Sequence, residues 1–235
     1  MTKYFIIISF CSTLCSFGQT TKDSLTSGFT IDPAIRVEVE KNISTSEFGT
    51  GQDILLIYNN RMLFDFYEND TLVASAKEED NKSTVFKSFY YWKGDTLSID
   101  GAYGLFEGIG FSIKVSNGKA TLYHMLAADK SPSFAYNEKD SLIFRLEVPC
   151  TDTKIVLSEI PDMTKKPIIY GYVEFKSVDY YVSKGDIDGQ EILPRNKQRA
   201  NMKIYFKSAY LNLETPYVKP HNVPHPAKAR KKTQK

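Results

Sequence analysis

Apolar and polar side chains alternate with a period of two along most of this 235-residue chain from Ala34 onward. That period is typical of β-strands, in which successive side chains point to opposite faces of a sheet. No segment of ten or more residues carries the 3.6-residue period of an amphipathic helix. We expect strands over residues 35–39, 53–58, 61–67, 71–76, 84–92, 96–99, 111–115, 120–127, 142–148, 154–157, 168–182 and 201–213. The pattern predicts an all-β fold, an antiparallel sandwich or barrel of roughly ten to twelve strands.

Turn-forming residues separate these strands. Asn59-Asn60 and Asn117-Gly118 each lie between two apolar runs, and Asn and Gly adopt positive φ more easily than other residues do. The sequence therefore predicts a two-residue hairpin at each of these pairs. Polar clusters at 68–70 and 93–95 predict two further turns.

The composition of successive segments suggests how the chain is organised. Residues 19–33 are polar and predict a flexible leader, whereas 34–215 contain the strands and predict a single β domain. The segment 160–167 (IPDMTKKP) is the best candidate for an internal break, and 183–200 is polar and loop-like. Residues 216–235 include four prolines and few apolar side chains. They cannot bury enough surface to offset the entropy of ordering, so we expect a disordered tail.

The first eighteen residues have the pattern of a secretory signal peptide. Lys3 precedes an almost uncharged apolar run over residues 4–14, and Ser16 and Gly18 then supply small residues at the two positions that a signal peptidase reads. The run is shorter than the roughly 20 residues that span a bilayer. The leader resembles signal peptides of Gram-negative envelope proteins, which implies cleavage between Gly18 and Gln19. We expect an extracytoplasmic protein (periplasmic, at the cell surface or secreted) without a transmembrane segment in the mature chain.

Cleavage at this site would leave one cysteine, Cys150, because Cys11 and Cys15 lie in the leader. A single thiol cannot form an internal disulfide, which excludes a cystine-stapled scaffold. Cys150 follows Pro149 at the end of an expected strand. We interpret it as a small buried apolar residue.

The net charge of +2 conceals an uneven distribution. Residues 216–235 carry six Lys or Arg and no acidic residue. Removing these six and Lys3 from the 30 basic residues leaves 23 against 28 acidic residues, a net charge of −5 for the folded body. Nucleic acid is therefore not an expected partner. The basic tail could instead contact an anionic surface.

The residues that carry most enzyme chemistry are scarce. His124 is the only histidine outside the tail, and it alternates with Leu122 and Leu126. We interpret it as a hydrogen-bonded core or rim residue. The chain lacks a nucleophile elbow, a zinc-protease helix motif, a phosphate-binding glycine loop and a C-x-x-C pair. The sequence thus predicts no cofactor, no metal site and no identifiable catalytic residue.

The tripeptide D-[ST]-L recurs at Asp70-Thr71-Leu72, Asp95-Thr96-Leu97 and Asp140-Ser141-Leu142. The structural interpretation is that Asp ends a turn, the hydroxyl residue opens a strand, and Leu enters the core. The pattern also resembles an O-glycosylation sequon of exported bacterial proteins. That resemblance makes Thr71, Thr96 and Ser141 candidate O-glycosylation sites.

Aromatic residues are the remaining candidates for a functional surface. Most aromatic side chains fill cores, but those of one strand alternate onto both of its faces, so one face must be covered or be free for a partner. The candidate ligand or partner surface comprises Phe89, Tyr90, Tyr91, Trp92, Tyr170, Tyr172, Tyr180 and Tyr181.

Three functions remain open. The leading hypothesis is a non-catalytic, soluble envelope or secreted β protein that binds an envelope protein or a small ligand at an aromatic surface or barrel mouth. The first alternative is a secreted hydrolase that acts on glycans through paired carboxylates. The second is a structural envelope component that docks through its basic tail.

Overall fold

The computed structural model describes residues 26–49, 53–58, 61–76, 86–103, 108–185 and 191–213. The predicted signal peptide and its cleavage site lie outside these residues. So do most of the predicted flexible leader, the Asn59-Asn60 pair and the basic tail.

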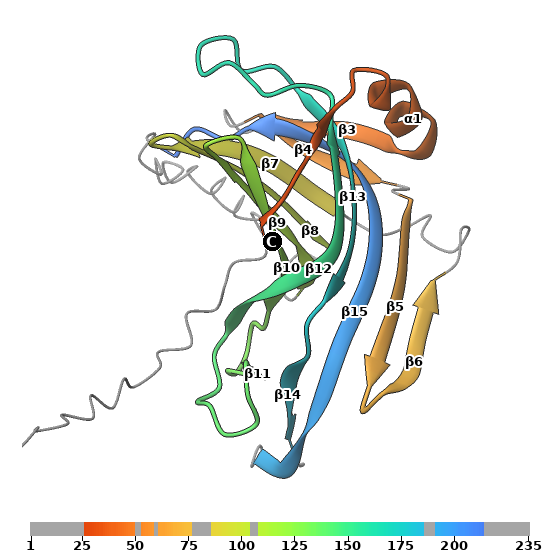
Figure 1. Ribbon diagram of the computed structural model, residues 1–235, viewed down its shortest axis with the longest axis vertical. Coiled ribbons are helices and arrows are strands. Elements are labelled where there is room, and N and C mark those ends of the chain that lie inside the picture. The colour runs from red at the N-terminus through yellow and green to blue at the C-terminus, as the bar shows by residue number, and fades with distance from the viewer. Residues whose placement is uncertain are drawn as a thin grey trace, which may run out of the picture.

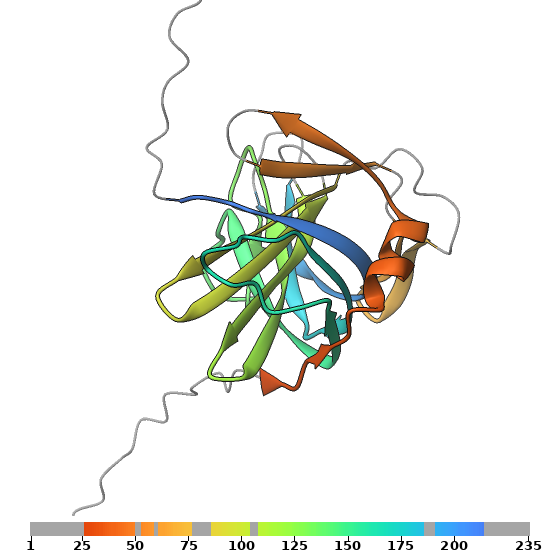
Figure 2. The ribbon, with the colours of Figure 1, turned by 90° about the horizontal axis from the view of Figure 1, so that it is seen from above.

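Seven strands form a closed ring (Figures 1 and 2). They are β7 (Phe86–Lys93), β8 (Thr96–Tyr103), β9 (Gly108–Ser116), β10 (Lys119–Ala127), β12 (Arg145–Leu157), β13 (Ile169–Ser177) and β15 (Glu191–Tyr210). Each pairs antiparallel with the next in this order. The end of β15 then pairs in parallel with β7, with Ala209 opposite Phe89 and Tyr210 opposite Tyr90. The described chain is therefore all-β, as predicted, and its sheet closes into a barrel.

The remaining strands extend this sheet. The first half of β15 projects beyond the ring and pairs with β14 (Tyr180–Gly185) on one edge. The middle of β15, residues 198–204, pairs with β5 (Met62–Glu68) on its other edge, as Figure 1 shows. The others are β1 (Thr26–Ser27), β2 (Thr30–Ile31), β3 (Ser44–Gly49), β4 (Asp53–Tyr58), β6 (Thr71–Ala76) and β11 (Phe134–Ala135). Of the fifteen described strands, β1, β2 and β11 contain only two residues each.

The strand predicted over residues 35–39 is wrong, because Ile35–Asn42 form the helix α1. Ile35 and Val39, one helical turn apart, are buried, whereas Val37 between them is 56% exposed. The helix begins after Asp32-Pro33, and the Asp32 carboxylate accepts a hydrogen bond from the Ala34 N–H at 2.9 Å. An acidic residue followed by proline is a helix-start signal, which the strand interpretation overlooked.

The hairpin predicted between 53–58 and 61–67 is also wrong. Strand β4 pairs with β3 and β7, whereas β5 pairs with β15 and β6. The two adjacent apolar runs therefore extend different strands of the sheet. Local turn chemistry cannot reveal this, because each run obtains its partners from residues far away in the sequence.

The other predicted turns are confirmed. Asn69 and Asp70 have φ of 47° and 65° between β5 and β6, and Asn117 and Gly118 have φ of 50° and 72° between β9 and β10. Positive φ at both central residues is the hairpin geometry that matches strand twist. Gly94, with φ of 58°, lies in the turn between β7 and β8.

The end of the chain is more regular than its pattern predicts. The expected strand 168–182 is divided into β13 and β14, which both pair with β15. The expected loop 183–200 contributes the first ten residues of β15. Polar contacts replace an apolar face here: Asp70 lies 2.9 Å from the Lys197 ammonium and 3.1 Å from the Arg199 guanidinium. The segment 160–167 connects β12 to β13, and these two strands pair directly.

Aromatic side chains fill the interior of the ring. Phe86, Phe111 and Phe206 are fully buried, and the rings of Phe111 and Phe206 are 4.9 Å apart. Gly171 lies opposite Phe206 on the neighbouring strand, and a Cβ atom there would be 2.2 Å from the Phe206 ring. The absent side chain thus provides the space that the aromatic ring occupies.

Candidate functional site

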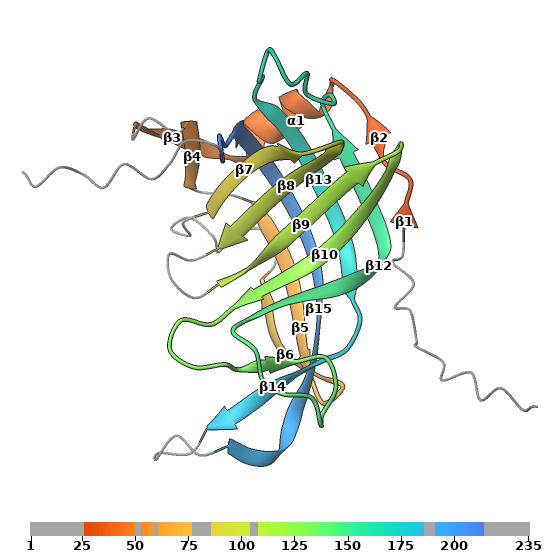
Figure 3. The same ribbon diagram turned by 90° about the vertical axis from the view of Figure 1, so that its left-hand side faces the viewer.

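Strands β8 and β10 finish, and β9 begins, at the same end of the ring (Figure 3). A pocket of about 410 Å³ lies there, which we call the mouth pocket. Seven strands contribute to its lining: β5, β8, β9, β10, β11, β14 and β15. The lining residues are Phe66, Tyr103, Gly108, Ile109, Leu126, Ala127, Phe134, Tyr180, Val182 and Gln198. Aromatic and aliphatic side chains dominate this set, so the pocket suits an apolar molecule.

The strand period explains why the mouth pocket is apolar. Leu122, His124 and Leu126 lie on one face of β10 and are all buried, as the alternation predicts. Leu126 is the outermost of the three and reaches the pocket. Tyr180 packs with Leu126 from the opposite side of the interior, and burial raises the pKa of its hydroxyl above the usual range.

His124 lies one strand period further inside than Leu126. Its side chain is fully buried, which confirms the prediction of a core position. Nδ1 is 3.1 Å from the Gly110 carbonyl oxygen and donates to it, because a carbonyl can only accept. Burial of the ring lowers the pKa of His124 to about 4, although the Gly110 carbonyl opposes this shift. The imidazole is therefore neutral at pH 7.

The second ring nitrogen of His124 departs from the prediction of a hydrogen-bonded residue. Nε2 is buried and has no hydrogen-bond partner among the described residues. Its surroundings are aromatic: the imidazole lies 5.8 Å from the Tyr180 ring, 6.0 Å from Phe175 and 6.3 Å from Phe66, between centroids. A bare acceptor in such surroundings is uncommon, because a buried polar atom without a partner is destabilising.

The predicted aromatic surface is distributed over several parts of the molecule. On β7, Tyr90 is buried in the ring and Trp92 packs against the same core. Phe89 and Tyr91 occupy the alternate positions, and their rings stack at 6.3 Å. The two faces of β7 therefore belong to different environments.

The other four predicted aromatic residues are also separated. Tyr170 and Tyr172 share a face of β13 and pack with the helix α1 residues Ile35 and Val39. Tyr180 lines the mouth pocket, whereas the half-buried Tyr181 follows it on β14 and alternates to the opposite face. Of the eight predicted residues, Tyr180 alone lines the mouth pocket.

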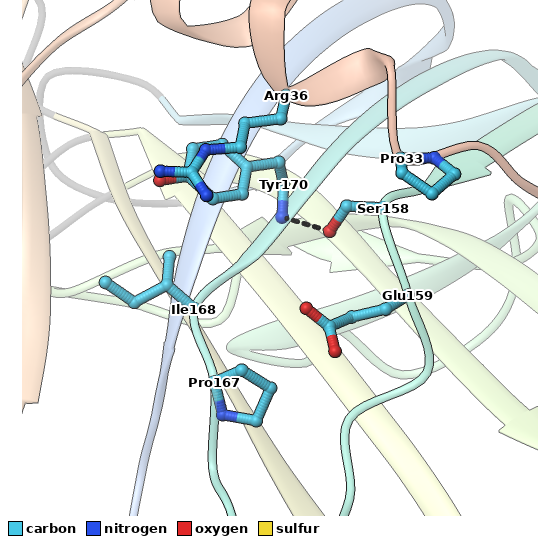
Figure 4. A pocket seen from close by; sticks show the side chains of 7 residues that line it. All are labelled: Pro33, Arg36, Ser158, Glu159, Pro167, Ile168 and Tyr170. Atoms are coloured by element: carbon cyan, nitrogen blue, oxygen red, sulfur yellow. Dashed lines mark hydrogen bonds between the residues drawn. The ribbon is translucent and has the colours of Figure 1, made fainter.

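A second pocket, of about 530 Å³, lies at the opposite end of the ring beside α1 (Figure 4). Two of the polar side chains that line it make contacts with other residues of the protein. The Ser158 hydroxyl accepts a hydrogen bond from the Tyr170 N–H at 3.1 Å. The Arg36 guanidinium lies 4.9 Å from the Tyr170 ring centroid and 3.2 Å from the Glu40 carboxylate. These partners account for the Ser158 hydroxyl and the Arg36 guanidinium.

A polar cluster lies among alternate residues of β8 and β9. Ser98 and Ser112 are buried, and burial raises the pKa of the Asp100 carboxyl above its usual range, against the lowering effect of the Ser112 hydroxyl. One Asp100 oxygen has no hydrogen-bond partner among the described residues. Nearby, the Lys114 ammonium is 2.6 Å from the Glu147 carboxylate. This cluster contains the two carboxyl groups most relevant to the hydrolase hypothesis.

The remaining candidate residues lie at the start of a strand, on an exposed segment or in the core. Thr71 opens β6 directly after a turn, Thr96 opens β8, and Ser141 lies on an exposed segment before β12. Leu97 is buried, as the turn interpretation predicts. At the first copy the turn and the strand opening are present, but Leu72 is 50% exposed and does not enter the core. At the third copy Ser141 does not open a strand, because β12 begins at Arg145. Cys150 is buried, as predicted, and desolvation raises the pKa of its thiol.

Sequence reasoning missed most of the mouth pocket. Phe66, Phe134, Val182 and Gln198 come from four strands that meet only through the pairings of β15 and β14. The available signal was the alternation of β10, which places Leu126 and His124 on the inner face. The aromatic residues concentrated on β7 do not line the mouth pocket. Two of them, Tyr90 and Trp92, pack in the filled core instead.

No protein-family model matches the chain, and neither a curated protein nor a solved structure is significantly similar to it. Within the described ranges, no three or more His, Cys, Asp or Glu side chains are grouped so that they could hold a metal ion. No helix in the same ranges is long and apolar enough to cross a membrane. Function must therefore be argued from the geometry of the pockets.

Proposed function

We propose that this chain is an exported β protein that binds a small apolar molecule in the mouth pocket and performs no chemistry on it. The observation that carries the proposal is an open pocket at this end of the barrel, lined mainly by aromatic and aliphatic side chains. Its volume of about 410 Å³ lies within the range of pockets that hold small ligands.

The shape and chemistry of the pocket favour binding over catalysis. The lining residues contribute two phenol hydroxyls, one amide and no carboxylate, lysine or arginine. The neutral His124 lies behind the lining, its pKa lowered by burial. An apolar ligand would lose its hydration shell in this pocket and gain about 25 cal/mol for each Å² of apolar surface buried.

Titration with N-phenyl-1-naphthylamine, whose fluorescence rises in apolar surroundings, tests this function. We expect saturable binding to the purified mature protein. Val182→Phe adds a ring inside the pocket and should weaken binding about tenfold, equivalent to ~1.4 kcal/mol. The matched control is Val37→Phe, because Val37 is 56% exposed on α1, beside the second pocket at the opposite end of the ring. Absence of saturable binding, or equal weakening by both variants, would contradict the proposal.

Export is a separate part of this proposal and has its own test. The leader over residues 1–18 supports it. Mass spectrometry of the protein recovered from its native cell envelope or medium should find Gln19 at the N-terminus. Recovery of the uncleaved chain from the cytoplasm would contradict export and leave the binding proposal intact.

A glycan hydrolase is the second candidate function, and the environment of Asp100 is the observation that favours it. Glycosidases combine a carboxyl group of raised pKa, as general acid, with a second carboxylate. Burial raises the pKa of Asp100, and Glu147 is ion-paired with Lys114. Turnover of a polysaccharide panel that Asp100→Asn abolishes and Asp129→Asn, at an exposed position, preserves would establish this function. No turnover by the wild-type protein would eliminate it for those substrates.

A further inference from the structure

A buried polar atom that has no hydrogen-bond partner among the described residues lies in a side chain that packs against the lining of the mouth pocket. Nδ1 of His124 donates to the Gly110 carbonyl on the neighbouring strand β9, which fixes the tautomer with its proton on Nδ1. Nε2 is then an unprotonated acceptor. It has no hydrogen-bond partner among the described residues, and the side chain is fully buried.

The position of this atom relates it to the pocket. Nε2 is the ring nitrogen further from the β10 backbone. Two of the rings around the imidazole, Phe66 and Tyr180, also line the mouth pocket. Leu126, two residues along β10 on the same face, lines the pocket as well. The imidazole therefore packs against two aromatic side chains of the pocket lining, as well as against Phe175, which is not part of the lining.

We propose that the ligand of the mouth pocket is an apolar molecule with one neutral hydrogen-bond donor, such as an alcohol or a phenol, and that His124 Nε2 accepts its hydrogen bond. This inference rests on the binding function proposed above and specifies its ligand class. The donor enters first between Phe66 and Tyr180, and the apolar body fills the space between Ile109, Leu126 and Val182. A side-chain movement of Phe66 or Tyr180 opens the contact.

The chemistry of the neighbouring groups selects against other ligand classes. A carboxylate or phosphate would place a negative charge next to an unprotonated nitrogen and would bring no donor to it. A primary ammonium would lose its hydration among aromatic and aliphatic side chains without an opposing charge in the lining. A neutral hydroxyl satisfies Nε2 and brings no net charge into the interior.

The test compares two probes of nearly equal size, 1-naphthol and 1-methoxynaphthalene. They share the same ring system, but only 1-naphthol has an O–H donor. We expect the wild-type protein to bind 1-naphthol about tenfold more tightly, the effect of one hydrogen bond to an otherwise unpaired buried acceptor. In His124→Phe, which keeps a ring but removes both nitrogens, the two affinities should become equal.

A control variant identifies the acceptor. Tyr180→Phe removes the nearest phenol hydroxyl in the pocket and should retain the preference for 1-naphthol. Loss of the preference in Tyr180→Phe together with its retention in His124→Phe would assign the contact to Tyr180 and overturn the proposal.

A measurement on the wild-type protein covers the case in which His124→Phe does not fold. The ¹⁵N resonance of His124 Nε2 should move when 1-naphthol binds and stay in place with 1-methoxynaphthalene. The outcomes also separate the two proposals. Equal binding of both probes overturns the ligand class and leaves the binding function standing, whereas binding of neither overturns both.

Discussion

Aromatic side chains fill one part of the barrel interior, whereas the part at the mouth retains a pocket. In the filled part, Phe86, Phe111 and Phe206 interlock, and Gly171 makes room for one of the rings. At the mouth, Leu126, Phe134 and Tyr180 surround a hollow of about 410 Å³. Strands β5, β8, β9, β10 and β15 contribute side chains to both parts. The same sheet therefore combines an interlocked aromatic core with an open pocket.

Both parts contain a buried polar atom that has no hydrogen-bond partner among the described residues. In the filled part the Tyr90 hydroxyl donates to the Pro167 carbonyl at 2.6 Å, but Trp92 Nε1 has no partner. At the border of the mouth, His124 satisfies one nitrogen and leaves the other without a partner. Such atoms are destabilising, and of these two side chains only His124 packs against the lining of the mouth pocket.

Truncating one aromatic residue in each part should give the largest contrast. Phe206→Ala removes a fully buried ring and should cost roughly 3–5 kcal/mol of unfolding free energy. Phe134→Ala removes a half-buried ring at the pocket, where solvent already reaches the cavity, and should cost about 1 kcal/mol. Urea denaturation measures both. Equal losses would mean that the mouth is as tightly packed as the core.

Lowering the pH should destabilise the folded protein through His124. Burial lowers its pKa in the folded protein to about 4 from an ordinary value of 6.5. Below pH 6.5 the unfolded chain therefore binds a proton that the folded protein does not. Stability falls as the pH decreases from 6.5 to 4, by about 3 kcal/mol in total from this residue, and its contribution is constant above pH 6.5.

The His124→Phe variant isolates this contribution because it retains every other titrating group. The difference in unfolding free energy between wild type and variant should change by about 3 kcal/mol between pH 6.5 and 4. A difference that stays constant over this interval would show that the imidazole is hydrated in the folded protein.

A glycine substitution probes the filled part with a smaller effect. Gly171→Ala forces a methyl group against the Phe206 ring and should destabilise the protein by about 1–3 kcal/mol. Gly28→Ala is the matched control, because nothing lies within 4 Å of its added Cβ, and it should change stability by less than ~0.5 kcal/mol. Thermal unfolding compares the two. Equal effects would indicate that the ring interior has spare room near Phe206.

The sequence predicts local features of this fold well. The alternation of β9 and β10 identifies their buried faces, and Asn117-Gly118 identifies the hairpin between them, because both depend on residues close in the chain. The helix α1 was missed because eight residues contain too few turns for its period to stand out from an alternating pattern.

Long-range pairing explains the rest of what the sequence could not predict. Ring closure depends on Ala209 and Tyr210 meeting β7, more than a hundred residues earlier in the chain. The mouth pocket depends on the projection of β15, whose polar first half resembles a loop in the sequence. Leu126 was placed on the correct face, but its partners Phe66 and Val182 could be identified only from the pairings of β5 and β14.

Methyl NMR with N-phenyl-1-naphthylamine tests the central claim most directly, because it locates the ligand. The ligand should shift the methyl resonances of Ile109, Leu126 and Val182 in the mouth pocket. Those of Ile99 and Ile113 in the filled part should stay in place. Shifts confined to the exposed side chains of Leu72 and Val73, or no shifts at all, would contradict a ligand-binding mouth.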